Sequence, residues 1–147
     1  MDKSHDISVA NTLIKTTLDS MKGYADACEQ SDGSHRELFD SMSRERSQVA
    51  SKLQAQVALL GGDPEDDSSF TAAAHRTFMD LRAAVSGRDE EQIIKEVERG
   101  EDYLKAKYEA ALEDTEVSPE TRQVIQQCYE SVRKGHDTVS AIKHAMT

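Results

Sequence analysis

Apolar residues recur every three or four positions along most of this chain, a spacing that places them on one face of an α-helix. In the second half, such a stripe runs from Ile94 through Val97, Leu104 and Tyr108 to Ala111. No segment shows the alternation of apolar and polar residues that is typical of a half-buried strand. The sequence therefore predicts an all-α fold.

Helix start and stop signals divide the pattern into segments. Ser34 and Glu37 form a capping box, in which each side chain bonds the other residue's free backbone amide. Gly61 and Gly62 end the segment that follows, and Ser118 with Pro119 is a typical helix start. Five helices are predicted, over residues 6–30, 34–60, 69–87, 89–114 and from 118 onward.

The lengths of the predicted helices and of their turns suggest how they pack. Short turns join the first helix to the second and the fourth to the fifth, which makes two antiparallel hairpins. The shorter third helix, within 71–86, can carry the chain from one hairpin to the other. We expect a single domain over residues 1–147, a four-helix bundle with a crossover connection, as in ferritin-like folds. A plain up-down array of five helices is the alternative.

Composition excludes several classes of function. The formal net charge is −10 and no cluster of Lys and Arg offsets it, which argues against nucleic-acid binding. The longest apolar run, 57–60, is too short to span a membrane. The start of the chain has no apolar signal region, so a cytoplasmic protein is expected. No Gly-rich phosphate loop, Gly-x-Ser-x-Gly motif or activated cysteine points to an enzyme.

Glu101 occupies a position in the apolar stripe of its helix where an aliphatic residue is expected. An isolated buried carboxylate is too costly to keep, so it must be paired, protonated or bound to a cation. His136 lies on the flank of the apolar stripe of the last predicted helix. The favoured interpretation is a buried polar network in which Glu101 pairs with Arg46 or Arg99.

The alternative is a metal site. Counted from the turn near residue 116, Glu98 and His136 come out nearly level, with Glu101 about one turn away. The candidate ligands are Glu45, Glu98, Glu101 and His136, with His75 from the third predicted helix. Carboxylates and imidazoles of this kind suit iron, manganese or zinc. The Glu-x-x-His motif of di-iron bundles is missing, which counts against oxidase chemistry.

Several short motifs are similar to those of a bacterial family of unknown function described as ferritin-like four-helix-bundle proteins. They are Leu60-Gly61-Gly62-Asp63-Pro64-Glu65-Asp66, Ala74-His75-Arg76, Met79-Asp80-Leu81, Glu98-Arg99-Gly100-Glu101-Asp102 and His136-Asp137. The resemblance covers roughly residues 7 to 143, and Thr77-Phe78 departs from it. It implies a ferritin-like bundle in a bacterial cytoplasm, with a stress connection and no established activity. Bundles of this architecture pair through their helix faces, so a homodimer is expected.

Overall fold

The computed structural model describes residues 2–31, 33, 35–66 and 90–146, and this part of the chain holds helices and no strand. The helices are α1 (Lys3–Gln30), α2 (Arg36–Leu59), α5 (Glu90–Glu113) and α6 (Pro119–Ala145). The predicted all-α fold is confirmed. The third predicted helix, over 69–87, lies outside the described residues. No described helix is long and apolar enough to cross a membrane.

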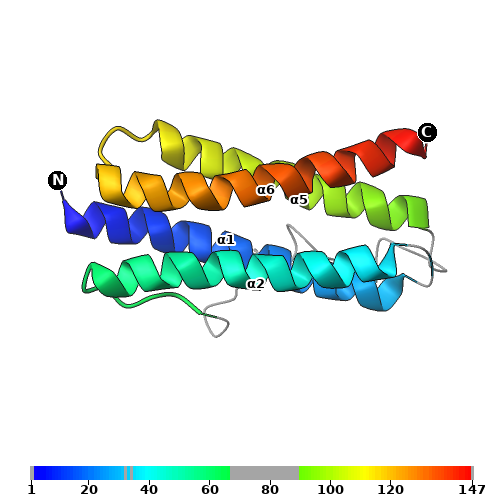
Figure 1. The fold of residues 1–147 in the computed structure, drawn as a ribbon, viewed down its shortest axis with the longest axis horizontal. Coiled ribbons are helices and arrows are strands. Elements are labelled where there is room, and N and C mark those ends of the chain that lie inside the picture. Colours follow the sequence, from blue (N-terminus) through cyan, green and yellow to red (C-terminus); the bar gives the residue numbers. More distant parts are fainter. Residues whose placement is uncertain (1, 32, 34, 67–89, 147) are drawn as a thin grey trace.

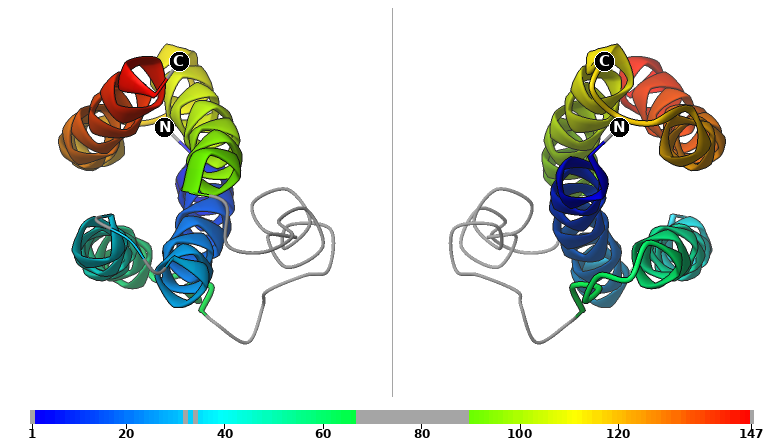
Figure 2. Two further views of the ribbon diagram at one scale, coloured as in Figure 1. Left: turned by 90° about the vertical axis from the view of Figure 1, so that its right-hand side faces the viewer. Right: turned by 90° about the vertical axis from the view of Figure 1, so that its left-hand side faces the viewer.

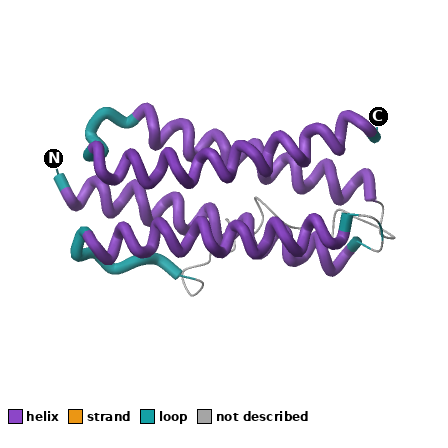
Figure 3. Tube along the Cα trace, viewed as in Figure 1, coloured by secondary structure: helices purple, strands orange, loops and turns teal. Residues whose placement is uncertain are grey.

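The four helices form two antiparallel hairpins laid side by side (Figure 1). Seen along the bundle, α1 packs between α2 and α5, and α6 packs between α5 and α2 (Figure 2). The end of α2 and the start of α5 lie at opposite ends of the bundle, as the helix tubes also show (Figure 3). The chain must therefore travel the length of the bundle between them. This is the predicted crossover, and because α5 packs directly on α1 and α6 on α2, the four described helices close into a four-helix bundle and not into an array of sequential neighbours.

Two predicted helix starts are wrong by a few residues. Helix α1 begins at Lys3 rather than at residue 6, because the side chain of Asp2 caps it by accepting a hydrogen bond from Ser4 N. Helix α2 begins at Arg36 with His35 as its N-cap residue and without a side-chain cap. His35 Nδ1 lies 3.1 Å from Glu90 Oε2 at the start of α5. Ser34, the first member of the expected capping box, lies outside the described residues.

Other boundaries follow the sequence signals. Ser118 caps α6 by accepting a hydrogen bond from Thr121 N, and Pro119 occupies the first turn. Helix α2 ends before Gly61, whose φ is 83°. Glycine adopts this left-handed conformation at little cost because it has no Cβ atom. The backbone amide of Gly62 then bonds to Val57 O at 2.9 Å.

The core is built from aliphatic and aromatic side chains of all four helices. Its fully buried members include Ile14 in α1, Leu53 in α2, Leu104 in α5 and Ile125 in α6. Cys128 belongs to this core and Cys28 packs against its edge, and both are free thiols. The apolar stripes read from the sequence are therefore the faces that meet in the centre.

One end of the bundle is tied together by Asp6, whose side chain is almost wholly buried in α1. Its carboxylate accepts hydrogen bonds from Ser118 N at 3.0 Å, from Ser118 Oγ and from Thr121 Oγ1 at 2.8 Å. Gln56 Nε2 of α2 donates to Thr121 Oγ1 at 3.0 Å. Three helices are thus joined at the start of α6.

We expect Asp6→Asn to lower the free energy of unfolding at neutral pH by about 1–3 kcal/mol, because the carboxylate loses charged hydrogen bonds. Burial alone would raise the pKa of Asp6, but the hydrogen bonds from Ser118 and Thr121 outweigh it and hold the pKa below 3.8. This stabilisation is complete above the unfolded-chain pKa and is lost as the pH falls through the lower folded pKa. Urea unfolding should therefore show the gap between wild type and variant closing in acid. A gap that stays constant would contradict this role.

Candidate functional site

A buried ion pair crosses the centre of the bundle between α2 and α5. Arg46 Nη1 lies 2.5 Å from Glu101 Oε1, and Arg46 Nη2 lies 2.8 Å from Glu101 Oε2. The two side chains are 0% and 1% exposed. Arg46 Nη1 also donates to Ser20 Oγ of α1 at 2.8 Å. The prediction that Glu101 points inward and pairs with a cation is confirmed, and Arg46 is that cation.

The electrostatics of the pair keep both members charged. Burial alone would lower the pKa of Arg46, but the Glu101 carboxylate outweighs it and raises that pKa further above its ordinary value. The ring of Tyr24 lies 5.4 Å from the guanidinium carbon, a cation–π contact that adds to the stabilisation. Burial, and then the negative charge of Glu101, raise the pKa of Tyr24 well above 10.0.

Gly135 of α6 has no side chain, and this leaves space for the guanidinium of Arg46 beside α6. A Cβ atom at this position would overlap Met42 Cε and lie 2.5 Å from Arg46 Nη2 and 3.6 Å from Glu101 Oε2. Any side chain larger than hydrogen would therefore press on the guanidinium. The mid-helix glycine, unfavourable in a helix by itself, is explained by the pair it faces.

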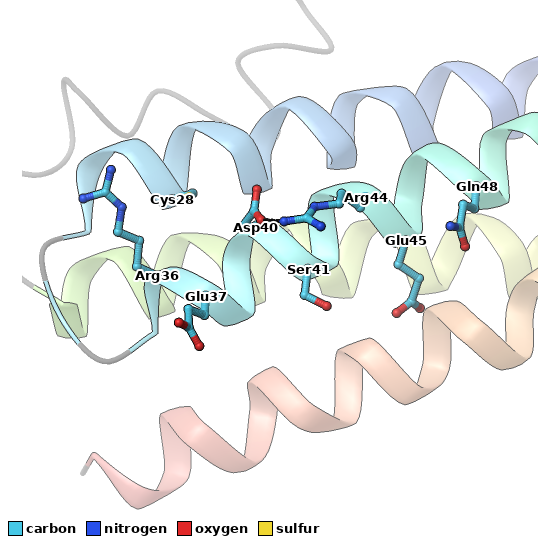
Figure 4. A pocket seen from close by; sticks show the side chains of 8 residues that line it. All are labelled: Cys28, Arg36, Glu37, Asp40, Ser41, Arg44, Glu45 and Gln48. Atoms are coloured by element: carbon cyan, nitrogen blue, oxygen red, sulfur yellow. Dashed lines mark hydrogen bonds and ion pairs between the residues drawn. The ribbon is translucent and has the colours of Figure 1, made fainter.

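The other proposed metal ligands bond to different partners. Lys143 Nζ lies 2.7 Å from Glu98 Oε1, and His136 Nε2 lies 2.7 Å from Asp102 Oδ1. Glu45 points from α2 toward α6, where Ser131 Oγ donates to it (Figure 4). In the described part of the chain, no three His, Cys, Asp or Glu side chains come together as a metal site would require. His75 lies outside the described residues.

The central layer does not fit a di-iron centre of the kind found in ferritin-like bundles. Such a centre needs carboxylates and imidazoles from facing helices. Here α2 contributes the permanent cation Arg46, which would repel a metal dication at this level. Both oxygens of Glu101 already accept hydrogen bonds from that guanidinium.

A hollow of about 800 Å³ lies on the surface, away from the ion pair (Figure 4). Charged and polar side chains from the first half of α2 line it, together with Cys28 of α1. Asp40 and Arg44 pair with each other along its floor. Because most of the side chains that line it are exposed to solvent, the hollow is a charged helix surface.

Ser20 and Tyr24 of α1 lie beside the ion pair, although the sequence pattern does not predict a role for either residue there. Asp19, the neighbour of Ser20 on α1, is buried, and burial raises its pKa to about 7. Ser20 and Tyr24 approach the ion pair from α1. The only signal for Ser20 and Tyr24 in the sequence is their spacing of four residues, which places them about one turn apart on the same face of a helix.

His136 should respond to its carboxylate neighbours in a pH titration. Burial alone would lower its pKa, but hydrogen bonds to Asp102 and Asp137 outweigh it and raise the pKa above 6.5. The resulting stabilisation is complete below 6.5 and is lost as the pH rises through the folded pKa. We expect Asp102→Asn to bring the pKa of His136, followed by NMR, down toward its ordinary value. The effect on stability should stay below about 1 kcal/mol, because Asp102 is exposed.

Asp137→Asn is the matched comparison, since Asp137 Oδ1 lies farther from the ring, at 3.2 Å from Nδ1. Its effect on the pKa of His136 should be smaller. An equal or larger effect would show that Asp102 is not the main partner.

Comparison with solved structures supports a ferritin-like fold. The chain is similar to a mutant of Dps1 from Mycobacterium smegmatis, with a TM-score of 0.80, 14% identity and 96% of each chain covered. A conserved hypothetical protein from Mycobacterium tuberculosis matches with a TM-score of 0.75 and 12% identity, over 97% of this chain and 99% of that one.

Dps from Microbacterium arborescens, in its high iron form, matches with a TM-score of 0.74 and 19% identity, over 97% of this chain and 95% of that one. Identities this low show the fold alone. No curated protein matches the sequence. The model of a family described as a domain of unknown function, DUF2383, matches residues 6–114, so the chain belongs to that family.

Proposed function

We propose that this protein is a non-catalytic ferritin-like bundle that acts by binding protein chains, with its central polar layer serving to fix how the helices pack. The observation that carries the packing role of this layer is the engagement of both Glu101 oxygens by Arg46. A layer closed in this way sets the alignment of α2 against α5, and the guanidinium engages both carboxylate oxygens that a metal would need. Buried polar pairs are known to specify register in helical assemblies. The binding of a second chain is motivated by the long helix faces of the architecture.

The proposal includes a homodimer in the cytoplasm. Two free thiols, Cys28 and Cys128, agree with a reducing compartment. The dimer is motivated by the long helix faces of the architecture. Sedimentation over a range of concentrations should show a dimer or larger species. A monomer at high micromolar concentration would contradict the proposed homodimer.

A second candidate function is metal binding by Glu45, Glu98, Glu101, His136 and His75, with iron, manganese or zinc. One observation favours it: the imidazole of His136 lies between two carboxylates, close to the α5 face that carries Glu98. A structure with the same fold was obtained in a high iron form. For binding here, Lys143 would have to leave Glu98 and Arg46 would have to leave Glu101.

One measurement separates the two candidates. Protein purified without a chelating tag is analysed for iron, manganese and zinc, and is then titrated with each ion. The structural proposal expects far less than one ion per chain and no change in thermal stability on titration. A near-stoichiometric ion that Glu98→Gln or His136→Ala releases, with the helices intact, would establish the metal site instead.

A further inference from the structure

The first half of α2 carries a row of polar side chains on its outer side. Among the described helices, α2 packs along α1 and α6, and its remaining side faces away from the bundle (Figure 2). The side chains of that side follow the three- and four-residue spacing of one helix face, and most of them line the surface hollow. They form the outer α2 strip, which consists of Arg36, Glu37, Asp40, Arg44, Ser47 and Gln48.

The outer α2 strip has no net charge, although the chain as a whole is strongly acidic. Its two arginines balance Glu37 and Asp40, whereas the whole chain has a formal net charge of −10. Two copies of such a chain repel each other over most of their surfaces. A contact between copies is therefore opposed least where the charges of the surface cancel, as they do in this strip.

The order of the charges makes the strip complementary to itself. Two α2 helices can lie antiparallel about a twofold axis level with Met42, so that positions equally far before and after Met42 face one another. Asp40 lies two positions before Met42 and Arg44 lies two positions after it, so each Asp40 faces Arg44 of the second copy. Because the twofold axis repeats every contact, this pairing of opposite charges occurs twice.

The other members of the strip also face suitable partners in this arrangement. Arg36 and Gln48 lie six positions before and after Met42, and Glu37 and Ser47 lie five positions before and after it. The arginine therefore faces an amide oxygen that can accept its hydrogen bond, and the glutamate faces a hydroxyl that can donate one. Like charges of the strip do not face each other.

We propose that the outer α2 strip binds the same strip of a second copy of this chain, with the two α2 helices antiparallel and each Asp40 paired with Arg44 of the other copy. This inference rests on the homodimer proposed above and names its interface. Within one copy, Arg44 Nη2 contacts Asp40 Oδ2 one helical turn away, and the two side chains are 76% and 47% exposed (Figure 4). A guanidinium has five N–H donors, so Arg44 keeps donors for the carboxylate of the second copy.

Reversing one charge of the pair tests the interface. In Asp40→Lys, and equally in Arg44→Glu, both symmetric contacts between the copies bring like charges together. We expect the dissociation constant of either variant, measured by sedimentation of the full chain, to rise at least about tenfold. Both positions lie on the surface of the helix, so circular dichroism should show that the helices remain folded.

Mixing the two variants separates a lost contact from general damage to the surface. A copy with Asp40→Lys and a copy with Arg44→Glu present opposite charges to each other at both contacts. The mixture should therefore form a heterodimer with a dissociation constant close to that of the wild type. Arg133→Glu is the matched control, because it reverses one member of an exposed ion pair on α6, outside the strip, and should leave the dissociation constant unchanged.

The possible failures of this experiment are distinguishable. A wild type that stays monomeric would contradict the homodimer itself, and with it any interface. A wild-type dimer that both charge reversals leave unchanged would overturn the α2 interface alone. Variants that dissociate singly and do not recover on mixing would overturn the antiparallel pairing of Asp40 with Arg44.

Discussion

Replacing Glu101 with leucine alone should lower the free energy of unfolding by about 3–5 kcal/mol, the usual cost of leaving a buried charge without its partner. The guanidinium of Arg46 is 0% exposed, and Glu101 supplies the carboxylate that compensates its charge. Ser20 and the ring of Tyr24 remain, but neither is an anion. Urea unfolding, with an m-value that stays constant, is the measurement.

The double variant Arg46→Met/Glu101→Leu should recover most or all of this loss. Replacing both members of a buried ion pair by apolar residues of similar size is often neutral, or stabilising by about 1–4 kcal/mol. A double-mutant cycle therefore gives a large coupling energy between the two positions. Losses in the single variants that simply add in the double variant would contradict the pairing.

The control for this cycle is an exposed ion pair of the same chemistry. Arg133 Nη2 lies 2.9 Å from Glu130 Oε2 on the surface of α6, and both side chains are about half exposed. Because solvent screens this pair, Glu130→Ala should change stability by less than about 1 kcal/mol. The contrast separates the effect of burial from that of ion pairing itself.

The sequence was sufficient for the architecture, because the fold rests on signals that act locally. Apolar spacing marks the buried face of each helix, and Ser118 with Pro119 marks the start of α6. Helix starts are predicted less accurately, because a cap can lie outside the apolar stripe and because contacts with other helices also act on the first turn. Periodicity alone shows where an apolar stripe begins, so it does not reveal the Asp2 cap, which lies four residues before the predicted helix start. At His35, the contact with Glu90 depends on the packing of α5, which a local pattern does not contain.

For the site, the sequence predicts that Glu101 has a cationic partner, but it does not show which arginine that partner is. A carboxylate in an apolar stripe must be compensated, so a cation facing Glu101 was expected. The choice between Arg46 and Arg99 depends on which side of its helix each residue occupies. Arg99 lies on the outer face of α5, and its Nη2 lies 2.9 Å from Glu96 Oε2.

The position of a residue along the helix axis does not show toward which side of the helix its side chain points. Glu98 and His136 were expected to lie nearly level, which suggested a shared site. In the structure their side chains bond outward, to Lys143 and to Asp102. Predicting this requires the side-chain directions of both helices in their final packing.

Gly135→Ala should destabilise the protein, although the same change inside an ordinary helix stabilises it by about 0.5–1 kcal/mol. The new methyl group would meet Met42 Cε and come within 2.5 Å of Arg46 Nη2. The methionine end is flexible and can move aside. The guanidinium is fixed by two hydrogen bonds to Glu101, so it moves only by weakening them. We expect a net loss of about 1–3 kcal/mol, typical of an overpacked core, measured by urea unfolding.

Two comparisons identify which neighbour resists the methyl group. Gln127→Ala, at an exposed position of the same helix, should change stability only slightly and in the favourable direction. In the Arg46→Met/Glu101→Leu background, position 46 carries a flexible side chain without fixed hydrogen bonds, so Gly135→Ala should cost much less there than in the wild type. If the cost is the same in both backgrounds, Met42 or the helix backbone sets it, and Gly135 is not there to make room for the ion pair. A stabilising Gly135→Ala in the wild type would count against the close packing of α6 on Arg46 altogether.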